Sequence, residues 1–264
     1  MNIIVLVKQV PDTSAIKIDK ETNTLIRVGV PNIINPDDLA GVEEALKLKA
    51  CYGGKVTTIT MGPTQAESML HELFAMGVDE GYLLTDRRFA GSDTWATSRI
   101  LSAFIEKLDY DLIIAGYQAI DGDTAQVGPQ VAEFLSLPQV THLHEVVGLE
   151  GQELIVVKKT DYEYETLAVH LPALITTRKE MNAPRQMNAF DIWNLDQKKV
   201  QIKTFDDLSL NLSDIGLAGS PTKVRKTYTR PVTSKAEKVV MEPDDAAKKI
   251  VELLYPYMEV KHHG

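Results

Sequence analysis

The sequence predicts an α/β protein built around a doubly wound parallel sheet, and three observations support this fold class. Residues 2–7 are predicted to form a strand that is apolar at every position after Asn2, which is typical of a strand at the centre of a parallel sheet. Short apolar runs then alternate with segments of helical spacing up to residue 135, as in chains whose parallel strands are joined by helices. Within residues 111–130 the order is strand, loop and helix, which is the order found at nucleotide sites of such folds.

The elements of the predicted sheet follow in chain order from local patterns. Residues 37–51 form an amphipathic helix with Val42 and Leu46 on its apolar face, and Gly53 and Gly54 end it. The elements after this helix are a strand at 56–61, a helix at 64–75, a strand at 81–85, a helix capped by Asp93 that runs to residue 108, and a strand at 112–115.

The pattern changes beyond residue 140 to one expected of antiparallel strands. Residues 145–149, 154–159 and 162–170 alternate between apolar and polar side chains, and residues 173–177 read as a buried strand that returns to the parallel sheet. A small hairpin at the edge of the fold is expected at 16–28.

Two domains are expected, an α/β domain at 1–205 and a C-terminal arm at 206–264. Residues 219–234 are rich in Gly, Pro, Ser, Thr and basic residues, which is the composition of a linker. A last helix begins after Pro243 and must pack its apolar face against another surface, a face made of Ile250, Leu253, Leu254 and Tyr257.

Composition excludes several classes of function. The formal net charge of −9 argues against a general nucleic-acid binder. Because neither a signal peptide nor an apolar run of membrane-spanning length is recognisable, we expect a cytoplasmic protein without membrane insertion. The histidines are scattered and Cys51 is the single cysteine, so no metal centre is predicted. Motifs of nucleophilic catalysis are also missing, so we predict no catalytic residues and expect a bound cofactor to carry any redox chemistry.

The strongest candidate site is the loop after the strand at 112–115. Gly122 allows its backbone to approach a ligand closely, and a helix spanning 124–135 is expected to begin at Asp123 or Thr124. The first turn of that helix carries no acidic side chain, so its free N–H groups are suited to a phosphate. On spacing alone, an ordinary strand–helix connection capped by aspartate fits equally well.

Four loops should converge at the carboxyl ends of the parallel strands, where α/β proteins bind ligands. Within them Asp121 and Asp123 are expected to be loop and capping residues rather than general acids, because a phosphate would repel a carboxylate. Lys8 is either a solvated strand end or a neighbour of the phosphate, and Asn35 is either a turn residue or a reader of adenine or ribose. The candidate cofactor-binding residues are Leu6, Val7 and Lys8; Asn35 and Asp38; Met61, Gly62 and Gln65; and Gly116, Ala119, Asp121, Gly122, Asp123, Thr124, Ala125, Gln126 and Val127.

Several motifs in the same chain resemble the beta subunit of electron-transfer flavoproteins. The loop Y-Q-A-I-D-G-D-T-A-Q-V-G-P at 117–129 is similar to the adenine-nucleotide loop of that family. The other motifs occur in the family order: V-L-V-K-Q-V-P-D at 5–12, N-P-D-D-L-A-G-V-E-E-A-L at 35–46, M-G-P-T-Q-A at 61–66, A-M-G-V-D at 75–79, L-P-A-L-I-T-T at 171–177 and N-A-P-R at 182–185. The resemblance implies a Rossmann-like fold of the adenine-nucleotide alpha-hydrolase type.

The resemblance also implies a function. The chain most resembles the group that holds FAD in the beta subunit, accepts hydride from NADH and bifurcates the electrons. In that group one electron goes to ferredoxin or flavodoxin. The other goes to a flavin-containing dehydrogenase through FAD in the alpha subunit. Gly122 and Ala125 stand in this loop where the group that holds structural AMP has larger residues. The alternatives are that AMP-holding electron carrier and, from another class, a nucleotide-binding module of the universal-stress type.

A second candidate surface follows the N-A-P-R motif. In the family this region resembles a recognition loop that anchors the flavoprotein on acyl-CoA dehydrogenases through a leucine. Ala189 occupies the position of that leucine, so Met187 or Phe190 is expected to supply the anchor instead. A packed loop without a docking role fits the pattern equally well. The resemblance further implies that the C-terminal arm reaches across to the alpha subunit.

Overall fold

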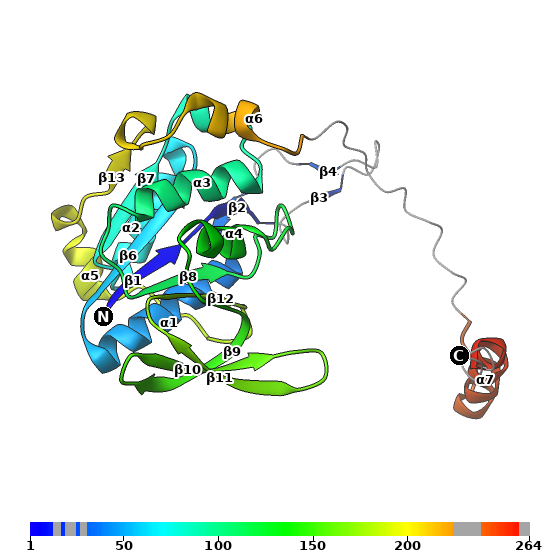
Figure 1. Ribbon diagram of the computed structural model, residues 1–264. Coiled ribbons are helices and arrows are strands. Elements are labelled where there is room, and N and C mark those ends of the chain that lie inside the picture. The colour runs from blue at the N-terminus through cyan, green and yellow to red at the C-terminus, as the bar shows by residue number, and fades with distance from the viewer. Residues whose placement is uncertain (13–16, 19–24, 27–30, 224–238, 259–264) are drawn as a thin grey trace. The chain divides into compact units, whose positions relative to one another are not determined.

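A computed structural model describes residues 1–12, 17–18, 25–26, 31–223 and 239–258 (Figure 1). The chain divides into two compact units, Met1–Val224 and Arg225–Gly264. Among the helices of the described residues, none is both long and apolar enough to cross a membrane.

The first unit is organised around a nine-stranded sheet with the strand order β11-β10-β9-β12-β8-β1-β6-β7-β13. Strand β1 lies inside the parallel part, paired with β6 on one side and β8 on the other, as the apolar run at 2–7 predicts. The parallel strands are β1 (Asn2–Leu6), β6 (Lys55–Met61), β7 (Glu80–Leu84), β8 (Leu112–Gly116), β12 (Ala173–Thr177) and β13 (Gln201–Lys203).

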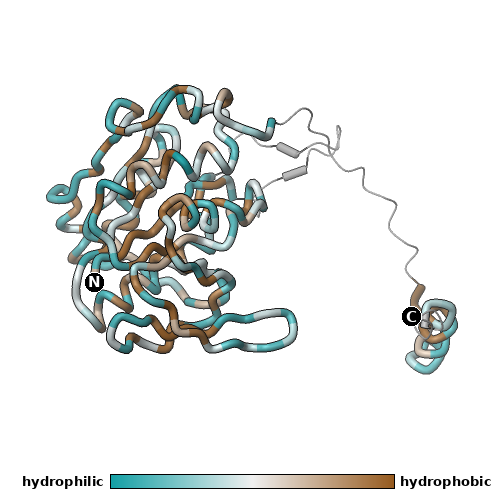
Figure 2. Tube along the Cα trace, in the orientation of Figure 1, coloured by the Kyte–Doolittle hydropathy of each residue, from teal (hydrophilic) through white to brown (hydrophobic). Residues whose placement is uncertain are grey.

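Helices cover both faces of this sheet, which makes it doubly wound (Figure 1). Alternate residues of β1 point to opposite faces: Ile3 and Val5 join one core cluster, and Ile4 and Leu6 join the other. The first cluster is covered by α1 (Pro36–Tyr52) and α2 (Glu67–Ala75), the second by α3 (Thr94–Ile105) and α4 (Val127–Phe134). The apolar segments therefore gather along the sheet, as Figure 2 shows.

An antiparallel extension continues the sheet beyond β12. Strand β9 (Gln139–Glu150) runs parallel to β12 and then pairs in antiparallel fashion with β10 (Glu153–Lys159), which pairs with β11 (Tyr164–His170). This confirms the predicted change of pattern, although β9 begins earlier than expected. Two small sheets complete the strands: β2 (Gln9–Pro11) with β5 (Asn32–Ile34), and β3 (Lys17–Ile18) with β4 (Leu25–Ile26). The rest of the hairpin expected at 16–28 lies outside the described residues.

The domain boundary differs from the expected one at 205, because the segment after β13 still packs on the α/β core. Leu208 and Ile215 are buried in the cluster under α3. The first unit therefore continues to residue 224. The short elements of its last third are α5 (Ala189–Trp193), η4 (Leu195–Gln197), η5 (Phe205–Asp207), η6 (Leu212–Asp214) and α6 (Gly216–Gly219).

Two of the predicted helices also differ from the structure at one end. The segment 64–75 is split into a 3-10 turn, η2 (Thr64–Ala66), and α2; another 3-10 turn, η3 (Arg87–Phe89), precedes α3. Asp93 does cap α3, since its side chain accepts a hydrogen bond from the backbone N–H of Ala96 at 3.1 Å, but the helix ends at Ile105 rather than 108.

The second unit contains α7 (Pro243–Met258), which confirms the helix predicted after Pro243. Asp244 and Asp245 lie in its first turn, where acidic side chains favour the helix dipole. Its apolar side chains Ile250, Leu253, Leu254 and Tyr257 are all more than half exposed.

Candidate functional site

The candidate site lies where the direction of sheet building reverses. From β1 the chain proceeds through β6 and β7 on one side, then returns to place β8 and β12 on the other side. In open α/β sheets, ligands bind outside the carboxyl ends of the strands at such a switch point. In this sheet the switch point lies between the loop after β1, which begins at Val7, and the loop after β8, which runs from Tyr117 to Gln126.

An ion pair joins these two loops. The ammonium Nζ of Lys8 lies 2.7 and 2.8 Å from the carboxylate oxygens of Asp121, and both side chains are partly exposed. Lys8 is thus not a free strand end, because it faces the loop that the sequence identifies as the strongest candidate. Leu6 and Val7, which precede it, are buried in the two core clusters on opposite faces of the sheet.

Asn35 and Asp38 connect the loops from within. Asp38 Oδ2 accepts a hydrogen bond from the backbone N–H of Lys8 at 2.8 Å, and Oδ1 accepts one from Asn35 Nδ2 at 2.9 Å. Asn35 Nδ2 also donates to the carbonyl of Gln118 at 2.8 Å, while its Oδ1 accepts from the N–H of Ile120 at 3.2 Å. The Asn35 amide is therefore used entirely within the protein. Direct contact of Asn35 or Asp38 with a cofactor stays a prediction.

Burial dominates the electrostatics at Asp38. The Asp38 carboxyl is shielded from solvent, and this desolvation raises its pKa to about 7 even though hydrogen bonds from Asn35 and Lys8 act in the opposite direction. The neighbouring carboxylate of Asp37 adds to the increase. Asp37 itself accepts hydrogen bonds from the backbone N–H groups of Lys179 at 2.9 Å and Gln118 at 3.3 Å.

The loop at 119–126 is compact and does not begin a helix at Asp123 or Thr124; that prediction is wrong. The N–H groups of Gly122 and Asp123 both donate to the carbonyl of Ala119, at 3.2 and 2.8 Å. Asp123 and Ala125 adopt left-handed backbone conformations, with φ of 48° and 53°, which interrupt a helix.

Proline explains where the helix does begin. Helix α4 starts at Val127, so Pro129 lies in its first turn, where the missing N–H costs nothing; a start at Thr124 would place the ring against a preceding carbonyl. The side chain of Gln126, the residue before the helix, makes no capping hydrogen bond within the described part of the chain. The first turn of the helix carries no acidic residue. The N–H groups at Val127 and Gly128 therefore remain suited to an anion.

The loop at 61–65 flanks the other side of β1. Gly62 N–H donates to the carbonyl of Leu84 at 3.1 Å, which holds the end of β6 against β7. The carbonyl of Gln65 accepts from Ser68 Oγ, which in turn lies 3.5 Å from Gln9 Nε2 in the segment after β1. This third loop thus reaches the β1 loop. Of the four predicted loops, those at Lys8, Asn35 and Asp121 are bonded directly to one another.

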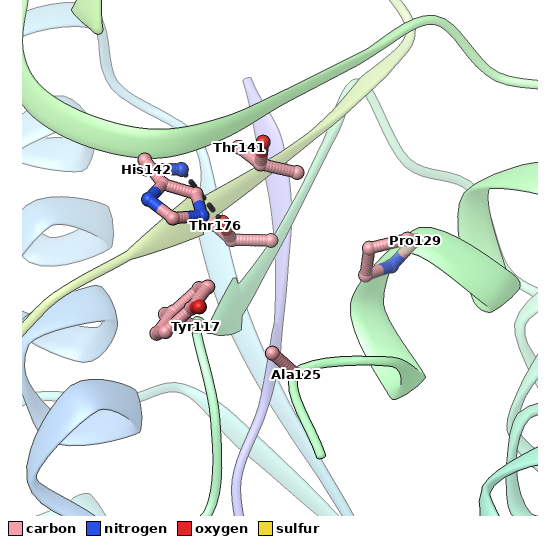
Figure 3. Close-up of a pocket in the computed structure, with 6 residues that line it drawn as sticks. All are labelled: Tyr117, Ala125, Pro129, Thr141, His142 and Thr176. Atoms are coloured by element: carbon pink, nitrogen blue, oxygen red, sulfur yellow. Dashed lines mark hydrogen bonds between the residues drawn. The ribbon is translucent and has the colours of Figure 1, made fainter. Parts of the chain in front are cut away.

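A cavity of about 230 Å³ lies beside the loop between β8 and α4 (Figure 3). The rings of Tyr117 and His142 form a T-shaped pair with centroids 4.3 Å apart, and the backbone N–H of His142 donates to Thr176 Oγ1 at 3.1 Å. Burial and the nearby positive charge of Arg178 lower the pKa of His142. The sequence analysis missed these residues; Ala125 of the predicted loop lies on the same cavity wall.

The N-A-P-R motif clamps the second candidate surface onto α1. Arg185 donates to both carboxylate oxygens of Glu43, from Nε at 2.9 Å and from Nη2 at 3.0 Å. Asn182 Nδ2 donates to Glu44 Oε2 at 2.9 Å and to the carbonyl of Ala40 at 3.2 Å. The two motifs at 35–46 and 182–185 therefore form one structural unit, which fixes the beginning of the segment that carries Met187.

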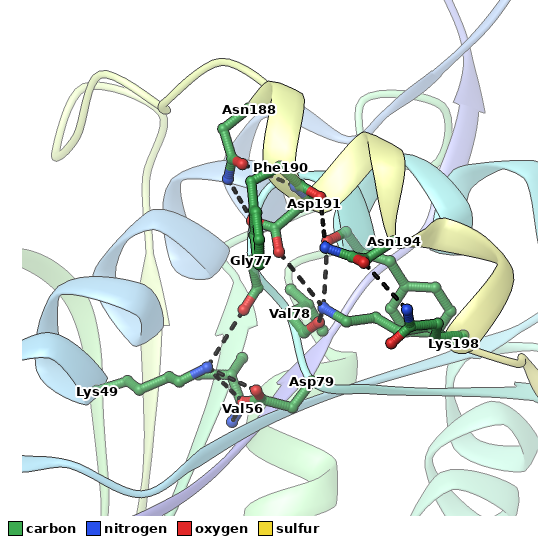
Figure 4. Close-up of polar contacts among 12 residues, drawn as sticks. Lys49, Val56, Gly77, Val78, Asp79, Asn188, Phe190, Asp191, Asn194 and Lys198 are labelled. Carbon is green, nitrogen blue, oxygen red and sulfur yellow. Dashed lines mark hydrogen bonds and ion pairs between the residues drawn. The ribbon is translucent and has the colours of Figure 1, made fainter.

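Polar contacts then fix α5 from beneath (Figure 4). Asn188 caps this helix by accepting from the Asp191 N–H at 2.8 Å, and its own N–H donates to the carbonyl of Ala75. Lys198 Nζ donates to the carbonyl of Val78 at 2.7 Å.

The apolar side chains of this segment remain outside the packed region. Met187 and Phe190 are 49% and 76% exposed, and Ala189 is also exposed. Two further exposed apolar side chains, Ile192 and Trp193, extend the surface, and Trp193 is 85% exposed. The sequence analysis missed Trp193, although its spacing of three from Phe190 places both on one side of a helix. We call Met187, Phe190, Ile192 and Trp193 the α5 patch.

Comparison with known proteins agrees with this geometry. Residues 22–207 match the family model described as the electron transfer flavoprotein domain. The chain is 52% identical to electron transfer flavoprotein subunit beta of Thermoanaerobacterium thermosaccharolyticum, over 96% of this chain and 98% of the relative. It is 46% identical to caffeyl-CoA reductase-Etf complex subunit CarD of Acetobacterium woodii, over 90% and 92% of the two chains.

A third relative has a different name. Acryloyl-CoA reductase electron transfer subunit gamma of Anaerotignum propionicum is 43% identical over 99% of both chains. The family match covers most of the α/β unit, and the relatives extend over nearly the whole chain. The chain therefore belongs to the electron transfer flavoprotein family as a beta subunit, and not to the universal-stress type of nucleotide-binding module.

Proposed function

We propose that this beta subunit holds FAD at the switch-point site and accepts electrons there from NADH. One observation carries the choice of FAD over AMP: Gly122 borders open space, since a Cβ built on it would have no neighbouring atom within 4 Å. A dinucleotide needs space for its second nucleotide beyond the phosphates. The loop that turns back on the Ala119 carbonyl has open space beside Gly122 that this second nucleotide would occupy.

The surrounding groups fit a pyrophosphate. The N–H groups of Val127 and Gly128 lie at the uncapped start of α4, and the ammonium of Lys8 supplies positive charge across the crevice. In the structure the Asp121 carboxylate pairs with the Lys8 ammonium. Bound phosphates would replace that carboxylate as the partner of Lys8. Asn35 and Asp38 hold the loops around the site in place through their hydrogen bonds to Lys8, Gln118 and Ile120.

FAD, when bound, accepts an electron pair as hydride and releases electrons singly, and this is the chemistry that bifurcation needs. In the proposed scheme one electron goes to ferredoxin or flavodoxin and the other to a dehydrogenase through FAD in the alpha subunit. This chain contributes position and environment: Leu6 and Val7 are buried where β1 ends, and the Asp38 network fixes the loops.

The names of two relatives support an acyl-CoA-type dehydrogenase as the acceptor, because one belongs to a caffeyl-CoA reductase complex and the other to an acryloyl-CoA reductase. The α5 patch is the proposed docking surface for it. Large exposed aromatic residues such as Phe190 and Trp193 are the side chains that most often anchor protein interfaces. The exposed apolar face of α7 is assigned to the alpha subunit.

Anaerobic titration of the purified heterodimer with NADH tests the proposal. Two bound FAD groups require two equivalents of NADH for complete reduction, whereas an AMP-holding heterodimer with a single FAD accepts one equivalent. If reduction were complete after one equivalent, or if NADH reduced no flavin, the AMP-holding carrier would replace the proposed function.

A further inference from the structure

The Asn35 amide can have only one orientation in the observed network. Its Nδ2 donates both to Asp38 Oδ1 and to the carbonyl of Gln118, and its Oδ1 accepts from the N–H of Ile120. Rotating the amide by half a turn would place Nδ2 against the Ile120 N–H and Oδ1 against the Gln118 carbonyl. Two hydrogen bonds to the nucleotide loop would then become repulsive contacts.

This orientation requires that Asp38 accept hydrogen bonds with both oxygens. Oδ1 faces the Asn35 donor, and Oδ2 faces the backbone N–H of Lys8. Protonation neutralises this carboxyl, so its oxygens accept the hydrogen bonds from the Lys8 N–H and from Asn35 Nδ2 more weakly than those of the carboxylate do. A proton on the Oδ1 lone pair that faces Asn35 would also oppose Asn35 Nδ2, and turning the amide would relieve that contact. That rotation releases Gln118 and Ile120.

We propose that Asp38 is a positioning residue whose ionised form orders the loop after β8, so that nucleotide binding there is linked to loss of a proton from Asp38. The inference rests on the proposed function in one respect, that the nucleotide contacts this loop. Its other steps depend only on the hydrogen bonds among Asp38, Asn35, Gln118 and Ile120.

The charged groups around Asp38 place the linkage near neutral pH. Burial, supported by Asp37 on the same helix, raises the pKa of Asp38 to about 7, while the ammonium of Lys8 from the β1 loop acts against the increase. Asp121, from the loop after β8, pairs with that ammonium, and Lys179, from the segment after β12, holds Asp37 through its backbone N–H. Protonation therefore increases as the pH falls below about 7, and loop order and affinity should fall with it.

The first test measures the affinity of the heterodimer for FAD at the beta-subunit site at pH 6 and pH 8. FAD is a suitable probe because its two phosphates are diesters and lack the second ionisation near pH ~6 of a phosphate monoester. With one linked proton, the wild-type affinity should be about tenfold weaker at pH 6 than at pH 8. Asp38→Asn should bind at both values at least as weakly as the wild type does at pH 6.

Two further variants separate the linkage from general damage. Asn35→Ala removes the amide that transmits the protonation of Asp38, so its affinity should also lose the pH dependence. Asp111→Asn is the matched control, because Asp111 Oδ2 accepts from the Asn2 N–H at the amino-terminal end of β1, and it should keep the tenfold change. A flat wild-type profile, or an unchanged slope in Asp38→Asn and Asn35→Ala, would overturn the proposal.

The second test needs no nucleotide, so it stays decisive if the proposed function fails. Hydrogen–deuterium exchange of residues 117–124 is followed in the heterodimer at the same two pH values and corrected with the Asp111→Asn control. Protection of this loop should decrease at pH 6 in the wild type and be low at both values in Asp38→Asn. Equal protection of the wild-type loop at both pH values would contradict the inference, whereas failure to bind FAD at any pH would contradict only the proposed function.

Discussion

The carboxyl group of Asp38 occupies the space directly beside the backbone of Gly116. A Cβ on Gly116 would lie 2.0 Å from Asp38 Oδ1 and 2.9 Å from the Asp38 backbone nitrogen. The first turn of α1 and the end of β8 thus approach as closely as the absence of a side chain allows. The geometry of the candidate site depends on this contact, because Asp38 also holds Lys8 and Asn35.

The variant Gly116→Ala should therefore damage both the fold and the site. The added methyl group must displace Asp38 or α1, and overpacking of this kind typically costs about 1–3 kcal/mol of folding free energy. We expect a lower thermal midpoint and loss of bound nucleotide. Gly122→Ala is the control, because no atom lies within 4 Å of its Cβ position, and its midpoint should equal that of the wild type. Equal midpoints for the two variants would show that the close packing is absent.

Gly122→Leu tests the ligand assignment without testing the fold. A leucine side chain has open space to enter in the absence of ligand, so the thermal midpoint of the nucleotide-free protein should not change. If FAD occupies that space, the same side chain should expel the beta-subunit flavin and leave the alpha-subunit flavin in place. Flavin content per heterodimer, measured by absorbance after release, checks this. Retention of both flavins would show that the ligand does not occupy the space beside Gly122.

Docking of the dehydrogenase should depend on the α5 patch. Phe190→Asp and Trp193→Asp each place a charge in the proposed interface, and we expect the KM for the dehydrogenase to rise by at least about tenfold while NADH reduces the flavin at the wild-type rate. Tyr162→Asp is a matched control, since Tyr162 is 97% exposed in the turn between β10 and β11. If all three variants delivered electrons equally well, the patch would have no docking role.

Association with the alpha subunit should depend on α7. Leu253→Asp and Leu254→Asp interrupt the exposed apolar face of the helix, and we expect the heterodimer to dissociate at concentrations where the wild type stays intact. Lys248→Gln alters a charged residue of the same helix and should leave association unchanged. Sedimentation or size-exclusion analysis of co-expressed subunits distinguishes the outcomes; wild-type association of both leucine variants would remove α7 from the interface.

Much of the fold could be predicted from local patterns. The run at 2–7, which is apolar at every position after Asn2, identifies the central strand, because only a strand covered on both faces tolerates so many consecutive apolar residues. After residue 140, apolar and polar residues alternate. This alternation identifies the antiparallel strands, because a strand with one face in solvent carries polar residues at every second position. The boundary at 205 could not be predicted well, because Leu208 and Ile215 are isolated apolar residues whose burial under α3 depends on tertiary packing.

The contacts within the candidate site could be predicted from the sequence only in part. The loops were identified correctly as neighbours at one edge of the sheet, but the direct bonds of Asn35 to Gln118 and Ile120 connect residues more than eighty positions apart. No local pattern encodes such a contact. The start of α4 is different: Pro129 is a visible signal that the helix begins near Val127, and it outweighs the capping preference of Asp123.

The most direct test of the central claim is the identity of the nucleotides that acid releases from the purified heterodimer. The account predicts two FAD molecules per heterodimer, one from each subunit, and no AMP, because the loop around Gly122 leaves room for the rest of a dinucleotide. Chromatography against FAD and AMP standards, normalised to protein, gives the stoichiometry. Release of one FAD and one AMP would contradict the claim and would identify this subunit as part of a simple electron carrier.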